Sequence, residues 1–419
     1  MVVFTFLNLS ITSFVASKNP DNEYLLPPPK STDVLLEDTI CCRMSIREFN
    51  SNPISDEDLS SILYAAFGTR SDDKYTVAGM NGVNSGIIYV LKEDAAYKYN
   101  SMNHSLIFYK AGDWRDNVGW QYPGAPIVLG LCWDKNLADS NFASVELGEI
   151  GQNIAFMTDT LGIGTVVTGE VPPAINRMGI PENEEGLIVM PLGYPLHPYN
   201  FKYNPMWISL LPKITKSTFS LSNAIEQRTE TTTFSGDISR KELSQLLWSS
   251  YGFSYNLDKS DQEKNQIIRH RTIPSAHGYY PLIMYAVTKN GIFRYQPNIL
   301  TKIFTVDFLG LPILTYLWGI RFGDKRVDIS QSSSLPSIDT APLSIIMVLD
   351  LDKAKDLSSE ELYKFWYFES GAAAHSVMLE ATTLGFKSNI AYPTDPNSIC
   401  NILKLNIRQI PLLIVPVGN

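Results

Sequence analysis

The segment RMSIREF, residues 43–49, places arginine, serine and arginine at alternate positions, and RTETTTF at residues 228–234 repeats its outline. Each segment is followed by a short polar turn, a serine (Ser55 or Ser239) and a helix-like stretch that ends at glycine. Serine before a helix and glycine after it are typical helix boundaries. The two segments therefore predict that one structural unit occurs twice in the chain.

The repeat continues beyond these segments, in the same order in both halves. Each half adds a loop leading into an apolar strand, a buried-type strand, a long helix that ends at Leu-Gly, and another apolar strand. The matching pairs are YTVAGMNGVNSGIIYVL with RTIPSAHGYYPLIMYAV, APIVLGLCWD with APLSIIMVLD, ELGEIGQNIAFMTDTLGIG with ESGAAAHSVMLEATTLGFK, and LIVMPLGYP with LLIVPVGN. We predict an α+β unit in tandem, with an N-terminal arm at 1–29 and domains at 30–205 and 206–419.

The composition excludes several classes of protein. A chain of 419 residues with 44% hydrophobic and 18% charged residues is typical of a folded protein with two domains. A formal net charge of −9 argues against a nucleic-acid partner, because phosphate backbones are bound by basic stripes. The 4 cysteines and 5 histidines show no metal-ligand spacing, so we expect no metal site and a reducing, cytoplasmic location.

Two apolar stretches need an interpretation. The run at residues 2–16 lacks the basic start of a signal peptide and is too short and polar to span a bilayer. We interpret it as an arm that packs on the fold or a partner, with a cleaved signal as the alternative. The run LGLPILTYLWGI at 309–320 has the length of a core helix, so we expect no contact with a membrane.

Arg43, Ser45 and Arg47 have the spacing of an anion site. Guanidinium donors match phosphate oxygens in pairs, and each charge-assisted hydrogen bond contributes roughly 1.5–3 kcal/mol. The alternative is that both arginines are solvated or pair with nearby carboxylates such as Glu48.

The order of motifs resembles the FMN-dependent nitroreductase family. An R-x-S-x-R-x-F opening, a helix, a PSA-G-YP loop entering a strand, an AP strand, and a long helix ending LG-x-G before a TGE loop carry the resemblance. The stretches LLPPPKS, HRTIPSAHGYYPL and NGIFRYQP are more specifically similar to the thiazole/oxazole-forming (SagB-type) dehydrogenase branch. The resemblance implies a flavin oxidoreductase in which FMN lies between two such units.

The resemblance also implies where FMN would bind. One loop would hold the ribityl phosphate and pyrimidine edge, a second would face N5 and O4, and a third is the loop that the partner subunit supplies in a homodimer. The implied cofactor-binding residues on these loops are Arg43, Met44, Ser45, Arg47, Thr168, Gly169, Glu170, Pro274, Ser275 and Ala276.

Each half lacks a motif that the other half keeps. Glu230 and Thr232 stand in the second half where the first has serine and its second arginine. Residues 78–80 have lost the PSA loop, and residues 391–393 have lost the TGE loop. The surviving motifs all belong to one composite site, so we predict an intramolecular pseudo-dimer with one FMN per chain.

The implied reaction is two-electron hydride transfer to or from a small organic substrate. Arg47 would stabilise negative charge at the N1/O2 edge of reduced flavin, and a backbone N–H of Gly169 or Glu170 would meet N5. No catalytic side chain is assigned. The hydride source is either NAD(P)H, bound transiently, or the substrate itself. The alternative function is a non-catalytic flavin-binding or degenerate scaffold or regulatory module.

Several further residues either face a ligand or only pack. The aromatic-rich stretches beside the site are candidates for the substrate wall, although aromatic residues more often belong to cores. The residues concerned are Trp120, Gln121, Tyr122, Tyr279 and Tyr280, with His277 and Arg271 beside them and Lys202 as an additional phosphate contact.

Overall fold

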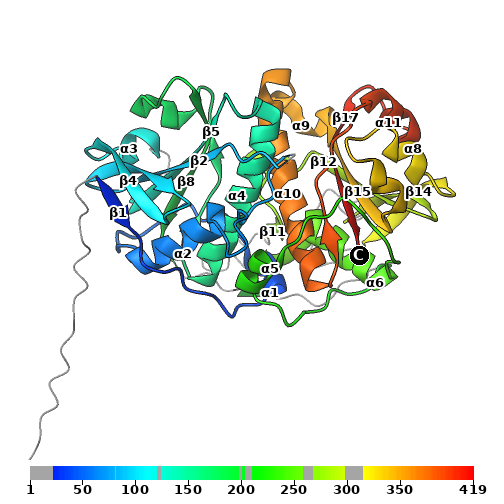
Figure 1. Cartoon of the computed structure of the whole chain (residues 1–419), viewed down its shortest axis with the longest axis horizontal. Helices are drawn as coiled ribbons and strands as arrows, with labels where there is room; N and C mark the ends of the chain where they lie inside the picture. Colours follow the sequence, from blue (N-terminus) through cyan, green and yellow to red (C-terminus); the bar gives the residue numbers. More distant parts are fainter. Residues whose placement is uncertain are drawn as a thin grey trace, which may run out of the picture.

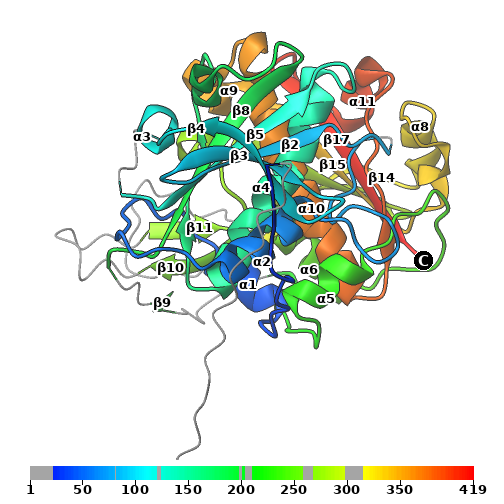
Figure 2. The ribbon, with the colours of Figure 1, turned by 60° about the vertical axis from the view of Figure 1, so that its left-hand side comes forward.

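The structure is a computed structural model, which describes residues 22–80, 82–119, 124–197, 201–202, 210–257, 268–297 and 315–419. Only the backbone is described at 201–202, 255–257 and 268–270. Two α+β halves lie side by side, and the long helices α4 (Ser140–Thr160) and α10 (Tyr363–Thr383) run between them (Figure 1). The same two helices lie at the centre in the turned view of Figure 2.

The first half contains an antiparallel sheet in the order β1-β4-β3-β2-β5-β8-β6, with β7 beside β8. Its strands are β1 (Glu23–Leu25), β2 (Gly86–Leu91), β3 (Ala95–Asn100), β4 (Ser105–Ala111), β5 (Ile127–Asp134), β6 (Gly164–Thr165), β7 (Thr168–Gly169) and β8 (Glu184–Gly193). Its other helices are α1 (Leu36–Cys42), α2 (Asp56–Phe67), α3 (Arg115–Val118) and the 3-10 helix η1 (Ala174–Met178).

The second half contains a sheet in the matching order β14-β13-β12-β15-β17-β16. Its strands are β12 (Leu282–Thr288), β13 (Gly291–Gln296), β14 (Tyr316–Phe322), β15 (Leu343–Asp350), β16 (Lys387–Ser388) and β17 (Gln409–Gly418). Its helices are α5 (Leu221–Gln227), α6 (Arg240–Tyr251), α8 (Arg326–Ser330), α9 (Leu351–Ala354), α11 (Pro396–Leu403), η2 (Ala276–Gly278), η3 (Pro336–Thr340), η4 (Lys355–Leu357) and η5 (Glu360–Leu362). Apart from β1 and β7, which only the first sheet contains, the two strand orders are equal, and this confirms the predicted tandem α+β fold.

A third, three-stranded sheet joins the connecting segment to the second half. Its order is β11-β10-β9, with β9 at Phe201–Lys202, β10 at Phe253–Leu257 and β11 at Ile268–Arg271. The described residues Phe201–Lys202 of the connecting segment therefore pair with β10 of the second half through backbone hydrogen bonds.

The predicted helix boundaries are confirmed, and the glycines have a physical reason. The Ser55 and Ser239 hydroxyls accept hydrogen bonds from backbone N–H groups in the first turns of α2 and α6. Gly68 and Gly252, which follow these helices, are extended, with ψ of 159° and 176°. A Cβ on Gly68 would lie 2.5 Å from the Tyr64 ring, so glycine is needed for close approach and not for a left-handed conformation.

The two halves are related as the subunits of a dimer would be. Leu36 N donates to Phe219 O at 3.1 Å, and Leu221 N donates to Val34 O at 2.9 Å, which is the same contact made in both directions. The helices α4 and α10 cross at a glycine from each. A Cβ on Gly148 would lie 2.8 Å from the Ala372 amide nitrogen, and one on Gly371 would lie 2.7 Å from the carbonyl carbon of Val145.

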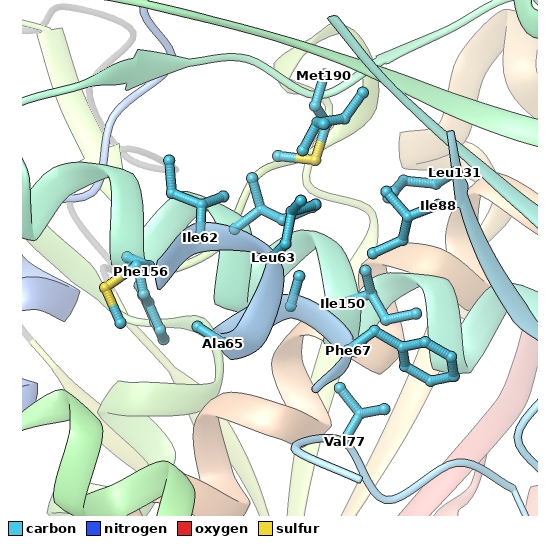
Figure 3. Close-up of a cluster of buried hydrophobic side chains, with 14 of the residues drawn as sticks. Ile62, Leu63, Ala65, Phe67, Val77, Ile88, Leu131, Ile150, Phe156 and Met190 are labelled. Atoms are coloured by element: carbon cyan, nitrogen blue, oxygen red, sulfur yellow. The ribbon is translucent and has the colours of Figure 1, made fainter. Parts of the chain in front are cut away.

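Within the first half, α2 and α4 cover one face of the sheet. Figure 3 shows Leu63 of α2 and Ile150 of α4 close to Ile88, Leu131 and Met190 of the strands. All five side chains are buried. This core fixes α4, whose other side packs on α10.

One expectation from the sequence is wrong. Within the described part of the run expected to be a core helix, Tyr316–Phe322 is strand β14, and the Trp318 side chain is 60% exposed. The strand pairs with β13 along its length, so tertiary pairing overrides the helical interpretation of an apolar run. Residues 309–314, and residues 1–21 of the arm expected at 1–29, lie outside the described residues. The described part of that arm contains β1, which pairs with β4.

The repeat also begins earlier than the motif comparison indicated. The Ser60 hydroxyl donates to Pro27 O at 2.5 Å, and the Ser244 hydroxyl makes the matching bond to Pro212 O at 2.8 Å. The Leu-Leu-Pro sequences at 25–27 and 210–212 are therefore equivalent. In the described part of the chain, no helix is both long and apolar enough to cross a membrane.

Candidate functional site

A cavity of about 770 Å³ lies between the two halves. This volume falls within the range of roughly 300–1,000 Å³ that is usual for small-molecule sites. The first half supplies residues of the RMSIREF segment and of 166–171, and the second half supplies the loop at 274–278 and part of the stretch from 357 to 369. Neither half could form this cavity alone.

Most of the residues that the resemblance implies come together at this cavity. Those that line it are Ser45, Arg47, Thr168, Gly169, Glu170, Pro274, Ser275 and Ala276. Their placement on three loops from two halves follows the predicted composite site. Their role as cofactor ligands stays a prediction.

Arg43 and Met44 are buried, at 3% and 5% exposure, and do not line this cavity. The Arg43 guanidinium donates through Nε and Nη2 to the carbonyl oxygen of Arg271, at 3.3 and 3.0 Å. Arg228 makes the matching contact from the second half, with Nη2 3.2 Å from Tyr75 O. Both arginines thus tie the halves together, and contact of Arg43 and Met44 with a cofactor also stays a prediction.

Arg47 presents its charge to the cavity. Among the described residues its guanidinium makes one hydrogen bond, to Ser45 O at 3.4 Å, and has no carboxylate within ion-pair distance. The expected alternative partner, Glu48, lies instead 3.9 Å from His197. A cation without a counter-ion beside a cavity is a natural anion ligand.

Strand β7 places the second loop against the cavity. The Thr168 hydroxyl oxygen is buried without a hydrogen-bond partner in the described structure, and Thr168 lines the cavity. A Cβ on Gly169 would lie 2.5 Å from the Phe365 ring, so glycine lets this strand pack closely on α10. Glu170 forms an ion pair with Arg177, which neutralises its charge at the cavity wall.

Arg271 supports the loop at residues 274–278 on the side away from the cavity. The Arg271 guanidinium carbon lies 4.9, 4.4 and 4.8 Å from the ring centres of Tyr251, Phe253 and Tyr280. Its Nη1 also donates to Tyr251 O at 3.0 Å. Arg271 is therefore enclosed by aromatic rings and does not line the cavity, whereas His277 does.

The remaining candidates for the substrate wall have different outcomes. Tyr279 donates its hydroxyl to Asp356 at 2.7 Å, outside the cavity lining. Lys202 is described only by its backbone, and residues 120–122 lie outside the described part of the chain.

Glu369 lines the cavity and was not identified from the sequence. Its side chain, on α10, accepts hydrogen bonds from Ser275 Oγ and Tyr251 Oη, each at 2.6 Å. Burial raises the pKa of Glu369 to about 7, although both hydroxyl donors and Arg271 oppose the rise. The available signal was an acidic residue at the start of an apolar helix segment in both halves, Glu146 and Glu369.

The tandem repeat also defines a second position, where the RTETTTF segment and residues 391–393 stand in place of the RMSIREF segment and residues 168–170. Side chains of the chain itself occupy this second position. The Arg228 side chain is fully buried and pairs with Glu230, the residue that replaces the serine of the first half. The Tyr392 ring, at the position of Gly169, packs on Phe142 with ring centres 4.9 Å apart. A carboxylate and an aromatic ring therefore stand where the first site has a hydroxyl and a glycine.

A second carboxylate, that of Glu149, lies near this second position. Glu149 of α4 accepts a hydrogen bond from Ala78 N at 2.7 Å, and its counterpart on α10 is Ala372. Glu149 also lies 3.4 Å from His375, with both side chains fully buried. Burial raises the pKa of Glu149 to about 8 and lowers that of His375. In the described structure, no group of three or more acidic, histidine or cysteine side chains is arranged for a metal ion.

The comparisons with known proteins agree with the tandem arrangement of the two halves. The nitroreductase family model matches the chain twice, at residues 40–194 and 235–419. The chain therefore belongs to the nitroreductase family and contains two family domains in tandem.

Individual relatives match either one half or the whole chain. A nitroreductase-family protein of Methanocaldococcus jannaschii is 29% identical over 189 residues, which cover 39% of this chain and 93% of the relative. A crystal structure from Anabaena variabilis covers 94% of this chain and 93% of its own, with a TM-score of 0.66 and 14% identity. A nitroreductase-family structure from Desulfovibrio desulfuricans in complex with FMN covers 39% of this chain and 87% of its own, with 17% identity and a TM-score of 0.30. The fold of the whole tandem arrangement is thus shared with the Anabaena protein, and membership of the SagB-type branch stays a prediction.

Proposed function

We propose that this protein is an FMN-dependent oxidoreductase that transfers hydride to or from a small organic substrate, with one FMN per chain between the halves. The observation that carries the proposal is the asymmetry of the two equivalent positions. One is a cavity beside Arg47, which has no carboxylate partner among the described residues, and at the other stand the Arg228–Glu230 ion pair and the Tyr392 ring. Loss of one site is compatible with function only if the two halves remain joined.

The residues present fit an anionic, partly aromatic cofactor. Arg47 and the Ser45 hydroxyl supply a charge and a donor on one side of the cavity. The Thr168 hydroxyl is buried behind the cavity lining without a hydrogen-bond partner among the described residues, and a small shift of this residue would add a further polar contact. Phe365 and Phe368 add apolar surface for a ring system. Together these groups match the chemistry of FMN, which carries a phosphate and a flat heterocycle.

Bound FMN would accept and release the hydride. Arg47, placed at the pyrimidine edge, would stabilise the negative charge of the reduced form. The apolar side chains of Leu357, Leu362 and Phe365 would exclude water from the cavity and so strengthen that electrostatic effect. NAD(P)H or the substrate would supply the electrons.

The proposal is tested by reconstitution with FMN and titration under anaerobic conditions. We expect flavin absorbance that persists through gel filtration, and bleaching by NADH or NADPH if the electrons come from a nicotinamide nucleotide. If neither nucleotide bleaches the flavin, an oxidisable substrate supplies the electrons. The first substrate to test is then a peptide that contains an azoline ring, which should bleach the flavin as it is oxidised. Failure to retain flavin would refute the proposal, and retention without reduction by any donor would favour a flavin-binding scaffold.

Arg47→Ala measures the contribution of the unpaired cation to FMN retention. The matched control is Arg115→Ala, which removes an arginine that pairs with Asp113 on the first half, outside the cavity lining. The first change should weaken FMN binding and the second should not. Equal retention by both variants would contradict the placement of the anionic group beside Arg47.

A further inference from the structure

We propose that Glu369 and Ser275 form the proton-transfer pair of the cavity, in which Glu369 holds a proton and passes it through the Ser275 hydroxyl to the substrate being reduced. This inference rests on the proposed function, because a hydride acceptor that also takes up a proton needs a nearby proton donor.

The geometry joins the carboxyl to the cavity by one hydroxyl. Glu369 and Ser275 both line the cavity, and Ser275 Oγ lies 2.6 Å from Glu369 Oε2. The backbone N–H of Tyr280 donates to the same hydroxyl at 2.9 Å and so fixes its position. A proton leaving Glu369 therefore has a hydroxyl in place between the carboxyl and the cavity.

On the side away from the cavity, Glu369 has no group to which it could pass a proton among the described residues. Tyr251 Oη donates to Glu369 Oε1 at 2.6 Å and accepts from Leu282 N at 3.2 Å. Burial beside Glu369 raises the pKa of Tyr251 well above its usual value, so Tyr251 keeps its proton. The backbone amide of Leu282 does not exchange protons in the reaction either. A proton on Glu369 can leave only toward the cavity.

The charged surroundings keep Glu369 ready to exchange a proton near neutral pH. Arg271, from β11, is the cation that favours its carboxylate form, and the three aromatic rings around Arg271 hold that charge behind the loop. Arg43 and Arg47 lower the pKa of Tyr280, which burial raises. Because burial outweighs Arg271 and the two hydroxyl donors and raises the pKa of Glu369 to about 7, both of its forms are populated at neutral pH. Such a pKa suits a general acid.

The proposed step balances for a substrate that gains two hydrogens, such as a quinone. FMN, if bound in its reduced form, would supply a hydride with two electrons. The proton leaves the Glu369 carboxyl, the Ser275 hydroxyl receives it and gives its own proton to the substrate oxygen. Glu369 remains as a carboxylate and regains a proton from water in the cavity after the product leaves.

The chain contains a matched control for this role. Glu146 occupies the equivalent position on α4, is 1% exposed, and has a pKa raised by burial to about 7. It accepts hydrogen bonds from Asn84 Nδ2 and from the Ser85 N–H and hydroxyl, at 2.8–2.9 Å. Glu146 does not line the cavity. Glu369→Gln therefore removes a buried carboxyl group that lines the cavity, and Glu146→Gln removes an equally buried carboxyl group that does not.

The first test counts protons taken up when FMN binds. Calorimetric titrations of the flavin-free protein with FMN, in buffers of different ionisation enthalpy between pH 7 and 8, give this number. Bound FMN would displace water from beside Glu369 and raise its pKa further, so the wild type should take up a fraction of a proton. Glu369→Gln should lose this uptake and Glu146→Gln should keep it. The same uptake in all three proteins, or loss in both variants, would overturn the inference.

The second test uses the FMN-loaded protein, reduced with one equivalent of dithionite under anaerobic conditions, and a soluble quinone. The rate of quinone reduction by the wild type should fall as pH rises through the pKa of Glu369, which burial raises to about 7 and bound FMN would raise further. Glu369→Gln should reduce the rate by roughly 10²-fold or more and flatten the profile, as loss of a general acid does. Ser275→Ala should keep the proton uptake yet slow the reduction. An unchanged profile in Glu369→Gln would overturn the inference while leaving the proposed function intact, whereas failure of the wild type to bind FMN would refute the proposed function itself.

Discussion

The substitution Gly371→Ala tests whether the crossing of α4 and α10 holds the cavity together. An added Cβ would lie 2.7 Å from the carbonyl carbon of Val145 and 2.8 Å from its Cα, and still closer to the carbonyl oxygen. These are backbone atoms of the opposing helix, so no side chain can rotate away and the helices must separate. Overpacking of this kind usually costs about 1–3 kcal/mol, and we expect the upper end. That is a large part of the roughly 5–15 kcal/mol that stabilises a typical domain.

Equilibrium urea unfolding, followed by tryptophan fluorescence, measures this loss. The control is Gly151→Ala on the facing helix, where the added Cβ would meet the end of the Phe368 ring at 2.7 Å. A ring can shift, so we expect the control to lose less stability. The separation of the helices should also weaken FMN binding in Gly371→Ala, because α10 carries Phe368 and Glu369 into the cavity wall. A variant as stable as the wild type within about 0.5 kcal/mol would refute the close crossing.

The remaining predictions concern charged groups. Arg47→Ala should raise the Kd for FMN by roughly 10–100-fold, the effect of losing one charge-assisted hydrogen bond, with little change in urea stability. Arg228→Ala should instead lower the free energy of unfolding by about 1.5–3 kcal/mol, because the buried guanidinium loses its ion pair with Glu230 and its hydrogen bond to Tyr75 O, while the partly exposed Glu230 keeps Lys74 as a partner. The flavin content per folded chain should not change. Burial raises the pKa of Glu380 to about 8, so the native state binds its proton more tightly than the unfolded state. Its contribution to stability is present at low pH and is lost as pH rises toward 8, and Glu380→Gln should reduce this loss in urea unfolding at pH 5 and pH 8.

The repeat, the helix ends and the loops of the candidate site could be predicted because each depends on local sequence. The Ser55 and Ser239 caps follow from side-chain hydrogen bonds within one turn. The unequal motifs of the two halves indicated which loops would share a cavity, since only one combination kept all three. Ser45 and Ser275 come from opposite halves and line that cavity.

The roles of buried side chains could not be predicted, because they depend on which element packs behind them. Arg43 has the sequence of an anion ligand, yet its guanidinium is directed to the carbonyl of Arg271. Arg271 itself is directed into three rings, two of which come from α6 and β10. Glu369 was hidden within an apolar helix, and its access to the cavity depends on the crossing of two helices far apart in sequence.

The closed second position was predicted only in part. Glu230 was recognised as a carboxylate where an anion would bind, and its ion pair with Arg228 agrees with that reasoning. The entry of Glu149 from α4 was not foreseen, because its counterpart Ala372 lies in a helix without an obvious motif. The two halves share a backbone fold but bury different charged side chains at equivalent positions such as Glu149 and Ala372.

A crystal structure of the FMN-loaded protein tests the central claim most directly. The account predicts one flavin per chain, with its rings in the cavity between Ser45 and Ser275 and with Arg47 in contact with it. A flavin beside Glu230 and Tyr392, or a cavity that excludes FMN while the cofactor binds elsewhere, would contradict it.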